Sequence, residues 1–314
     1  MKQPGKPSMT DQPRIAVTTS SFAKFSQEPM RLMTAAGYAP VLNPHGRKLT
    51  EDEAIEVLSG CVGVVAGTEP LTRRVLTALS GLKAIARCGT GMDNVDQEAA
   101  RELGMAVTNT PDGPTLAVVE LTLGLALDLV RDVTRMDREL RSGIWKKRMG
   151  RTLQGKRLGV VGFGRIGRAV ARAFAPLGVD IAYFDPFVDG LDTPKKSLDE
   201  LLVWADILTL HCSKPKEGGH LIGDRELRLM PRGSWLINCA RGGLVDETAL
   251  HAALAEGRLA GAALDVFEAE PYVGPLKDLD SVILTPHIGS YAMESRITME
   301  VDAVKNLLAS LGKG

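Results

Sequence analysis

Several apolar runs in the second half of the sequence end on side chains that can do chemistry. Arg241 follows GSWLINCA, Asp265 and Glu270 follow AGAAL, and two histidines, His211 and His287, close ADILTLH and SVILTPH. Histidine changes charge near neutral pH and suits acid–base catalysis, whereas an arginine after a buried run needs an anion to meet its charge. If these runs are parallel strands, their carboxyl ends share the edge of the sheet where such folds bind ligands. The residues alone leave His211 and His287 as alternative proton donors.

A glycine-rich turn is the sharpest sign of a cofactor. Gly162, Gly164 and Gly167 form GxGxxG between the apolar run RLGVV and a helical pattern. In a dinucleotide site, these three glycines permit a tight turn, close approach of a diphosphate, and close packing of helix on strand. Asp185 ends the next apolar run, 18 residues after Gly167. A carboxylate there accepts hydrogen bonds from ribose hydroxyls and repels a 2′-phosphate, which predicts NAD rather than NADP.

A second glycine turn, Cys88–Gly91, follows the run LKAIAR, but Asn94 stands where a third glycine would be needed. One interpretation is a turn whose backbone N–H groups hold a carboxylate. The other is a turn with no binding role.

The elements that position these residues follow an α/β pattern. Apolar, β-branched runs alternate with helical patterns, which predicts parallel sheets covered by helices. The expected strands are 14–20, 39–44, 61–67, 82–89 and 105–110, then 157–162, 180–186, 205–211, 233–240, 260–266 and 281–287. The proline- and glycine-rich segment 109–114 predicts a domain boundary. One long helix is expected over 115–140, and a last helix over 291–311 could return to the first domain.

Composition excludes several classes of protein. The 314 residues carry 38 Lys+Arg and 38 Asp+Glu, and this zero net charge argues against nucleic acid as a partner. The four cysteines lack metal-ligand spacing, so we expect no metal site and a reduced, cytoplasmic setting. The N-terminus lacks the apolar region of a signal peptide. The most apolar stretch contains Glu120 and Asp128, so we expect no membrane span.

The motifs GFGRIG with Asp185, NCARGGLVDETAL, AALDVFEAEP and LTPHIG resemble the D-isomer-specific 2-hydroxyacid dehydrogenase family. The segments GTGMDNVD, NTPDGPTLAVVELTLG and WKKRMGRTLQGKRLGVVGFGRIGR are most similar to its phosphoglycerate dehydrogenase branch. This resemblance implies a Rossmann NAD-binding domain, residues 111–291, inserted into a flavodoxin-like substrate domain made of residues 1–110 and 292–314. It also implies a homodimer formed through the helix after Thr115.

The resemblance also implies roles for individual residues. Arg241 would hold the substrate carboxylate and polarise the ketone, His287 would be the acid/base, and Glu270 would keep His287 protonated. The backbone around Cys88 and Gly89 would bind the carboxylate in the substrate domain. The implied cofactor residues are Gly162, Gly164, Arg165, Ile166, Gly167, Asp185, Ala240 and Asp265.

The implied activity is NAD-dependent hydride transfer between a 2-keto acid and a D-2-hydroxy acid. Phosphoglycerate dehydrogenases usually carry a basic residue where this sequence has Thr68 and Glu69, although Arg73 and Arg74 follow. The chain also ends at Gly314, without the C-terminal extension of many serine-pathway enzymes. The substrate is therefore open between 3-phosphoglycerate and the hydroxypyruvate or glyoxylate class. The alternative function is that of an NADH-sensing, corepressor-like relative without physiological turnover.

Overall fold

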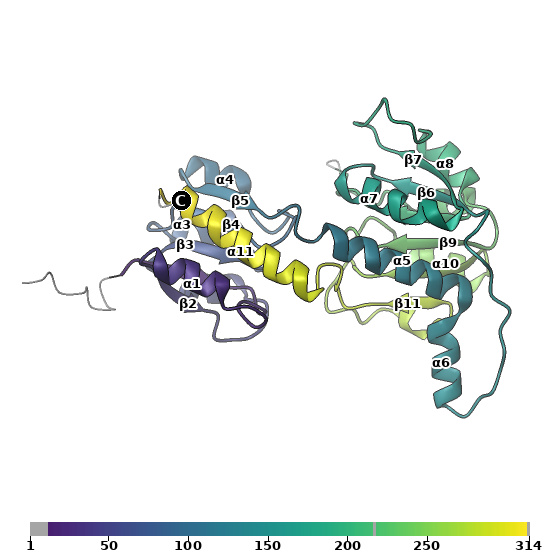
Figure 1. Cartoon of the computed structure of the whole chain (residues 1–314), viewed down its shortest axis with the longest axis horizontal. Coiled ribbons are helices and arrows are strands. Elements are labelled where there is room, and N and C mark those ends of the chain that lie inside the picture. The colour runs from purple at the N-terminus through teal and green to yellow at the C-terminus, as the bar shows by residue number, and fades with distance from the viewer. Residues whose placement is uncertain (1–11, 216–217, 313–314) are drawn as a thin grey trace, which may run out of the picture. The chain divides into compact units, whose positions relative to one another are not determined.

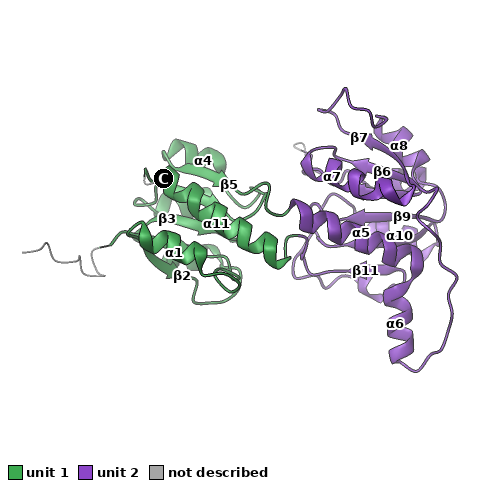
Figure 2. Cartoon of the chain, viewed as in Figure 1, with its two compact units in different colours: residues 1–114, 290–314 green, residues 115–289 purple. Residues whose placement is uncertain are grey.

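The structure, a computed structural model, describes residues 12–215 and 218–312. Its contacts divide the chain into two compact units, which Figure 2 colours separately. Unit 1 contains the described residues up to Pro114 and those from Ser290 onward, and unit 2 is the continuous segment Thr115–Gly289. The sequence assigned two short segments, residues 111–114 and 290–291, to the NAD-binding domain. By these contacts both segments belong to unit 1.

Unit 1 is built on a five-stranded sheet of order β2-β1-β3-β4-β5, in which all pairs are parallel. The strands are β1 (Arg14–Val17), β2 (Ala39–Leu42), β3 (Cys61–Ala66), β4 (Ala84–Arg87) and β5 (Ala106–Asn109). The helices are α1 (Glu28–Ala35), α2 (Glu51–Leu58), α3 (Arg73–Ala78), α4 (Gln97–Glu102) and α11 (Met293–Ser310). This strand order is that of flavodoxin-like folds, in which the winding direction reverses between β1 and β3.

Helix α11 returns from the end of the chain and lies alongside α1 (Figure 1). Met299, Ala303 and Leu307 recur every four residues on it and are fully buried. They pack with Ile15 of β1 and Val65 of β3 in one core of unit 1. Apolar residues at this spacing form one face of a helix, so the sequence itself directs α11 onto the sheet.

Unit 2 is built on a six-stranded parallel sheet of order β11-β10-β9-β8-β6-β7. The strands are β6 (Arg157–Val161), β7 (Asp180–Phe184), β8 (Ile207–Leu210), β9 (Ser234–Asn238), β10 (Leu259–Leu264) and β11 (Val282–Leu284). The helices are α5 (Thr115–Arg131), α6 (Val133–Arg141), α7 (Arg165–Phe174), α8 (Leu198–Trp204), α9 (Asp224–Leu229) and α10 (Glu247–Ala255), with 3-10 turns at Ala175–Leu177 and Pro275–Asp278. The predicted class, two α/β domains with parallel sheets, is confirmed.

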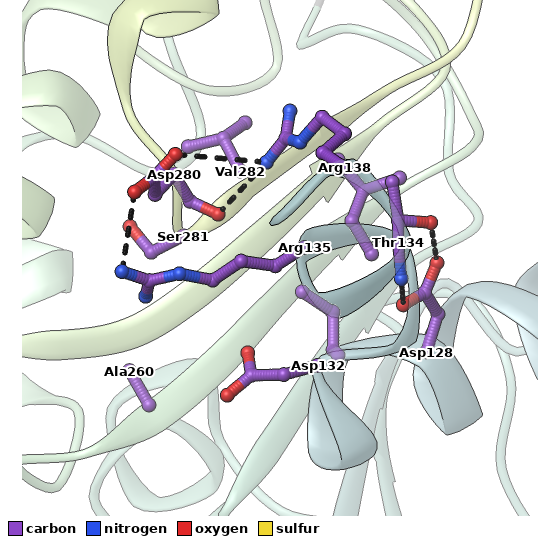
Figure 3. A pocket seen from close by; sticks show the side chains of 11 residues that line it. Asp128, Asp132, Thr134, Arg135, Arg138, Ala260, Asp280, Ser281 and Val282 are labelled. Carbon is purple, nitrogen blue, oxygen red and sulfur yellow. Dashed lines mark hydrogen bonds and ion pairs between the residues drawn. The ribbon is translucent and has the colours of Figure 1, made fainter. Parts of the chain in front are cut away.

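The single helix expected over 115–140 is wrong, because the chain breaks it at Asp132. This residue has φ of +54°, a left-handed conformation that aspartate tolerates better than most side chains. Asp128 accepts a hydrogen bond from Thr134 N at 2.8 Å, which closes the break. Arg135 and Arg138 of α6 both pair with Asp280, at 3.1 and 3.9 Å, and so fix the direction of the second helix (Figure 3).

Among the described helices, none combines the length and the apolar character that a bilayer-spanning segment requires.

Candidate active site

The loops after three neighbouring strands of unit 2 carry the predicted catalytic residues. Arg241 follows β9, Glu270 follows β10, and His287 follows β11, at one edge of the parallel sheet. The His287 Nδ1 atom lies 2.9 Å from Glu270 Oε2. Both side chains are partly exposed, His287 at 50% and Glu270 at 39%. The Nδ1 atom is therefore occupied by a carboxylate, and Nε2 is the nitrogen left to exchange a proton with a ligand.

The Arg241 loop is folded by Asn238, whose side chain is buried at the end of β9. Its Oδ1 accepts a hydrogen bond from Ala240 N at 3.1 Å, and its Nδ2 donates to Arg241 O at 3.0 Å. A side chain at Gly242 would meet Phe267 O at 1.7 Å, so only glycine fits there. This close approach brings the arginine loop directly against the loop that leads to Glu270.

Asp265 holds the loop that carries His287. It is buried, and its carboxylate accepts hydrogen bonds from the Thr285 hydroxyl at 2.6 Å, Ile288 N at 2.7 Å and Gly289 N at 2.7 Å. These partners flank His287, whose own φ is +54°. Burial raises the pKa of the Asp265 carboxyl, and the three hydrogen bonds oppose that rise. Oδ2 accepts only one of these bonds, and the cofactor role expected of Asp265 from the sequence stays a prediction.

His211, the other strand-end histidine, is not a suitable proton donor. Its Nε2 lies 2.9 Å from the hydroxyl of Thr209, and its Nδ1 is buried without a hydrogen-bond partner. Burial lowers the pKa of His211 to about 3, so the ring is neutral at physiological pH. Of the two strand-end histidines, His287 is the better placed to exchange a proton, and its role as the acid/base stays a prediction.

The glycine turn after β6 has the features of a diphosphate cradle. Gly162 has φ of +87°, and a side chain there would meet His211 O at 2.6 Å. A side chain at Gly167 would meet Gly162 O at 2.0 Å, so helix and turn are in direct contact. Gly164, by contrast, faces open space, which leaves the backbone at the N-terminus of α7 accessible to an anion. Arg165 and Ile166 begin that helix.

Asp185 lies directly after β7 and is tied to the same turn. Its two carboxylate oxygens accept hydrogen bonds from Phe163 N at 2.7 Å and Phe187 N at 2.8 Å. Each oxygen retains acceptor capacity, which is what two ribose hydroxyls require. The residues present therefore fit NAD. Gly162, Gly164 and Gly167 would hold the diphosphate end, and Asp185 the adenosine ribose.

In unit 1, the turn after β4 differs in detail from the expectation. Cys88 N donates to Ala66 O at 2.9 Å, and Gly89 N donates to the hydroxyl of Thr110 at 2.8 Å. Both N–H groups therefore already donate hydrogen bonds within unit 1. Within the part of unit 1 that the structure describes, no hydrogen bond involves Thr90 N or Gly91 N. A carboxylate at this turn would have to bind these two groups.

Glu69, in the turn after β3, is buried. Its carboxylate accepts a hydrogen bond from the Thr18 hydroxyl at 2.6 Å, and burial raises its pKa. A side chain at Gly67 would meet Glu69 Oε2 at 3.1 Å and Thr19 Cα at 3.2 Å. Gly67 therefore packs closely against the Glu69 carboxylate and the backbone that follows β1.

The side chains of the two nearby arginines, Arg73 and Arg74, form ion pairs with other helices of unit 1. Arg73 pairs with Glu102, and Arg74 pairs with Glu51 at 2.8 Å and with Asp52. These ion pairs join α3 to α4 and α2 on the exposed surface of unit 1.

One cluster of potential metal ligands occurs among the described residues, formed by His220, Asp246 and Glu268. Two of its potential ligand atoms already have partners within the protein. Asp246 caps α10 by accepting from Thr248 N and Ala249 N at 2.9 Å, and His220 Nδ1 lies 3.1 Å from Gly243 O. We assign it no metal.

Comparison with known proteins agrees with this arrangement. The model of the D-isomer specific 2-hydroxyacid dehydrogenase NAD binding domain matches residues 123–289. The chain belongs to this family. A solved structure from Thermus thermophilus, that of the TT0316 protein, superposes with a TM-score of 0.88 at 38% identity, covering 95% of this chain and 97% of that one.

Curated relatives carry three different substrate names. The chain is 39% identical to D-3-phosphoglycerate dehydrogenase of Methanocaldococcus jannaschii, over 83% of this chain and 52% of that protein. It is 38% identical to glyoxylate reductase of Thermococcus litoralis, over 86% and 85% respectively. It is 35% identical to hydroxypyruvate reductase of Thermotoga maritima, over 84% and 89%. The chain thus spans about half the length of the first relative and most of the length of the two reductases.

Proposed function

We propose that this protein reduces a small 2-keto acid without a phosphate, of the hydroxypyruvate or glyoxylate class, to the D-2-hydroxy acid with NADH. The observation that carries this proposal is the 2.9 Å pair of His287 and Glu270 on the sheet edge that also bears Arg241 and the glycine turn. A proton donor, a carboxylate that orients it and a basic clamp are the groups that ketone reduction requires.

Each side chain then has a defined task. Bound NADH supplies a hydride to the keto carbon. Arg241 binds the substrate carboxylate and polarises the carbonyl, because a guanidinium matches the planar geometry of an oxyanion. His287 donates a proton from Nε2 to the carbonyl oxygen, while Glu270 at Nδ1 stabilises the charged imidazole. In the oxidative direction, neutral His287 accepts the hydroxyl proton.

The substrate class follows from unit 1. The turn after β3 offers no cation at Thr68 or Glu69, and Arg73 and Arg74 are held in ion pairs between helices. These observations favour a substrate without a phosphate, because a doubly charged group needs cations within reach. 3-Phosphohydroxypyruvate is the competing substrate, supported by the relative named D-3-phosphoglycerate dehydrogenase.

The direct test is a panel of hydroxypyruvate, glyoxylate, pyruvate and 3-phosphohydroxypyruvate, assayed with NADH on the wild type and on His287→Ala. We expect the substitution to lower kcat by about 10²–10⁴-fold, the usual effect of removing a general acid. His251→Ala, which changes a histidine on α10, serves as the matched control and should keep full activity.

Retention of activity in His287→Ala to within about tenfold would contradict the assignment of the proton donor. A clear preference for 3-phosphohydroxypyruvate would overturn the substrate class. Tight NADH binding with no turnover of any keto acid would favour the NADH-sensing alternative.

We also propose that two copies associate through α5, α6 and the segment after them. Leu127 and Val133 are 43% and 55% exposed and line a hollow together with Gly124. Trp145 and Met149, beyond α6, are 81% and 98% exposed. Exposed large apolar side chains of this kind are typical of an interaction surface, and a second copy is the partner that the family resemblance implies.

A further inference from the structure

A buried guanidinium lies at the carboxyl edge of the unit 1 sheet. Arg296, in the first turns of α11, is only 5% exposed. Its Nε donates to the Ser21 hydroxyl at 2.9 Å, and its Nη2 donates to the Thr19 hydroxyl at 2.8 Å. The same Nη2 atom lies 3.8 Å from Cys88 Sγ. One side chain from the end of the chain therefore joins the loops that follow β1 and β4.

The charge of Arg296 is balanced inside the fold. Glu300, one turn further along α11, is 2% exposed, and its Oε1 lies 3.4 Å from Arg296 Nη2. Glu300 also accepts hydrogen bonds from the Ser21 hydroxyl at 2.8 Å and from Ala23 N at 3.0 Å. Apolar side chains of similar volume usually stabilise a fold as well as a buried ion pair does. Stability alone is therefore a weak reason for placing a guanidinium here.

The position of the pair suggests a different reason. In the order β2-β1-β3-β4-β5, the winding of the sheet reverses between β1 and β3. Flavodoxin-like folds bind ligands beyond the carboxyl ends of the strands at such a reversal. Thr19 and Ser21 follow β1, and Cys88 follows β4, so the Arg296 contacts span this point.

Several hydrogen bonds hold the turn formed by residues 88–91, among them one from Asn109 Nδ2 to Thr90 O at 2.8 Å. Thr110 fixes Gly89 by accepting from its N–H at 2.8 Å and donating its own N–H to Gly89 O at 3.1 Å. Arg296 contacts the first residue, Cys88, through the thiol. The N–H groups of Thr90 and Gly91 follow directly after Cys88 and Gly89, the residues that Arg296 and Thr110 contact.

We propose that Arg296 is a positioning residue for substrate recognition: it fixes the 88–91 turn so that Thr90 N and Gly91 N can bind the carboxylate of a 2-keto acid. This inference rests on the proposed function for the identity of the ligand. It makes Arg296 a determinant of selectivity for acids over the corresponding neutral amides. Its guanidinium acts through the turn and takes no part in hydride or proton transfer.

The test compares the wild type with Arg296→Lys and with the double variant Arg296→Met/Glu300→Gln, which leaves no buried charge unpaired. We expect KM for the best 2-keto acid to rise about tenfold, with kcat within about threefold, because the lost interaction is the same in ground and transition states. The kcat/KM ratio of the keto acid to its 2-keto amide should fall about tenfold, since the amide lacks the recognised charge. The dissociation constant of NADH should not change.

The matched control is Arg14→Met, at the opposite end of β1, where the arginine donates to Ser59 O at 3.1 Å. It should keep both KM and the acid-to-amide ratio. An unchanged ratio in the Arg296 variants overturns the proposal, whatever happens to their stability. If the double variant does not fold, the acid-to-amide ratio of Arg296→Lys alone tests the proposal, because a lysine cannot contact Thr19, Ser21 and Cys88 together.

A second measurement separates this inference from the proposed function. Oxamate, a non-reactive analogue of a 2-keto acid, should raise the melting temperature of the wild type more than that of Arg296→Lys. If the wild type reduces no keto acid, the proposed function fails. The changes in melting temperature caused by oxamate still test the role of Arg296 in that case. Equal shifts, or no shift with the wild type, overturn it.

Discussion

At the scale of single residues, two histidines at equivalent strand ends have opposite properties. His287 sits in a left-handed turn, partly exposed, with a carboxylate at Nδ1, whereas the ring nitrogens of His211 face Thr209 and the protein interior. The sequence predicted that both close a strand, but not which way either side chain points. The placement of His287 depends on Asp265, whose three donors lie 20 to 24 residues away along the chain. Such non-local hydrogen bonds have no signature in a sequence pattern.

The buried His211 predicts a pH dependence of stability. Its pKa is about 3 in the native protein, against an ordinary value of 6.5 in the unfolded chain. Between these values the unfolded chain binds a proton that the native protein does not, so stability is lost as pH falls below 6.5. We expect His211→Asn to flatten this dependence by up to about 1.4 kcal/mol per pH unit.

Urea unfolding followed by tryptophan fluorescence checks this, because all three tryptophans, Trp145, Trp204 and Trp235, belong to unit 2 along with His211. Comparison of the variant with wild type at about pH 7, 6 and 5 gives the difference in slope. His251→Asn provides the control on the surface of the same unit. Parallel slopes for wild type and His211→Asn would contradict the buried, neutral state.

At the scale of elements, the strands and the glycine turn were predictable because their signals are local. Each strand is a short apolar run bounded by turn residues, and GxGxxG requires glycine for steric reasons at Gly162 and Gly167. The break at Asp132 was missed because both flanking segments have helical sequences, and only backbone geometry distinguishes one helix from two. Arg296 was missed because an arginine within a helical pattern usually lies on a solvated face.

Asp132 offers a test of this break. Its left-handed conformation costs a β-carbon-bearing residue about 1–2 kcal/mol, a cost that glycine avoids. Aspartate tolerates this conformation better than alanine does, so we expect Asp132→Ala to unfold about 1 kcal/mol more easily than wild type. The free energy of unfolding of Asp132→Gly should equal or exceed that of wild type, to within about 0.5 kcal/mol, in the same fluorescence-detected urea unfolding. An alanine variant more stable than wild type would mean that α5 and α6 form one continuous helix.

At the scale of the whole molecule, the exposed apolar surface of α5 and the segment after α6 predicts self-association. We expect Leu127→Asp combined with Trp145→Ala to convert a dimer into a monomer, because a charge and a lost aromatic anchor both weaken an apolar interface. Light scattering coupled to size-exclusion chromatography gives the mass. Phe187→Ala removes a side chain that is 91% exposed elsewhere in unit 2 and should leave the mass of the dimer unchanged. A monomeric wild type at micromolar concentration contradicts the proposed dimer.

The discontinuity of unit 1 has a consequence for biosynthesis. A ribosome delivers all of unit 2 before it reaches α11, the helix that covers Ile15 and Val65 in a core of unit 1. At roughly 5–20 residues per second, the cofactor-binding unit can complete its fold while the part of the unit 1 sheet that α11 will cover is still exposed. The nascent chain is therefore most prone to aggregation, and most in need of a chaperone, on the segment that was translated first.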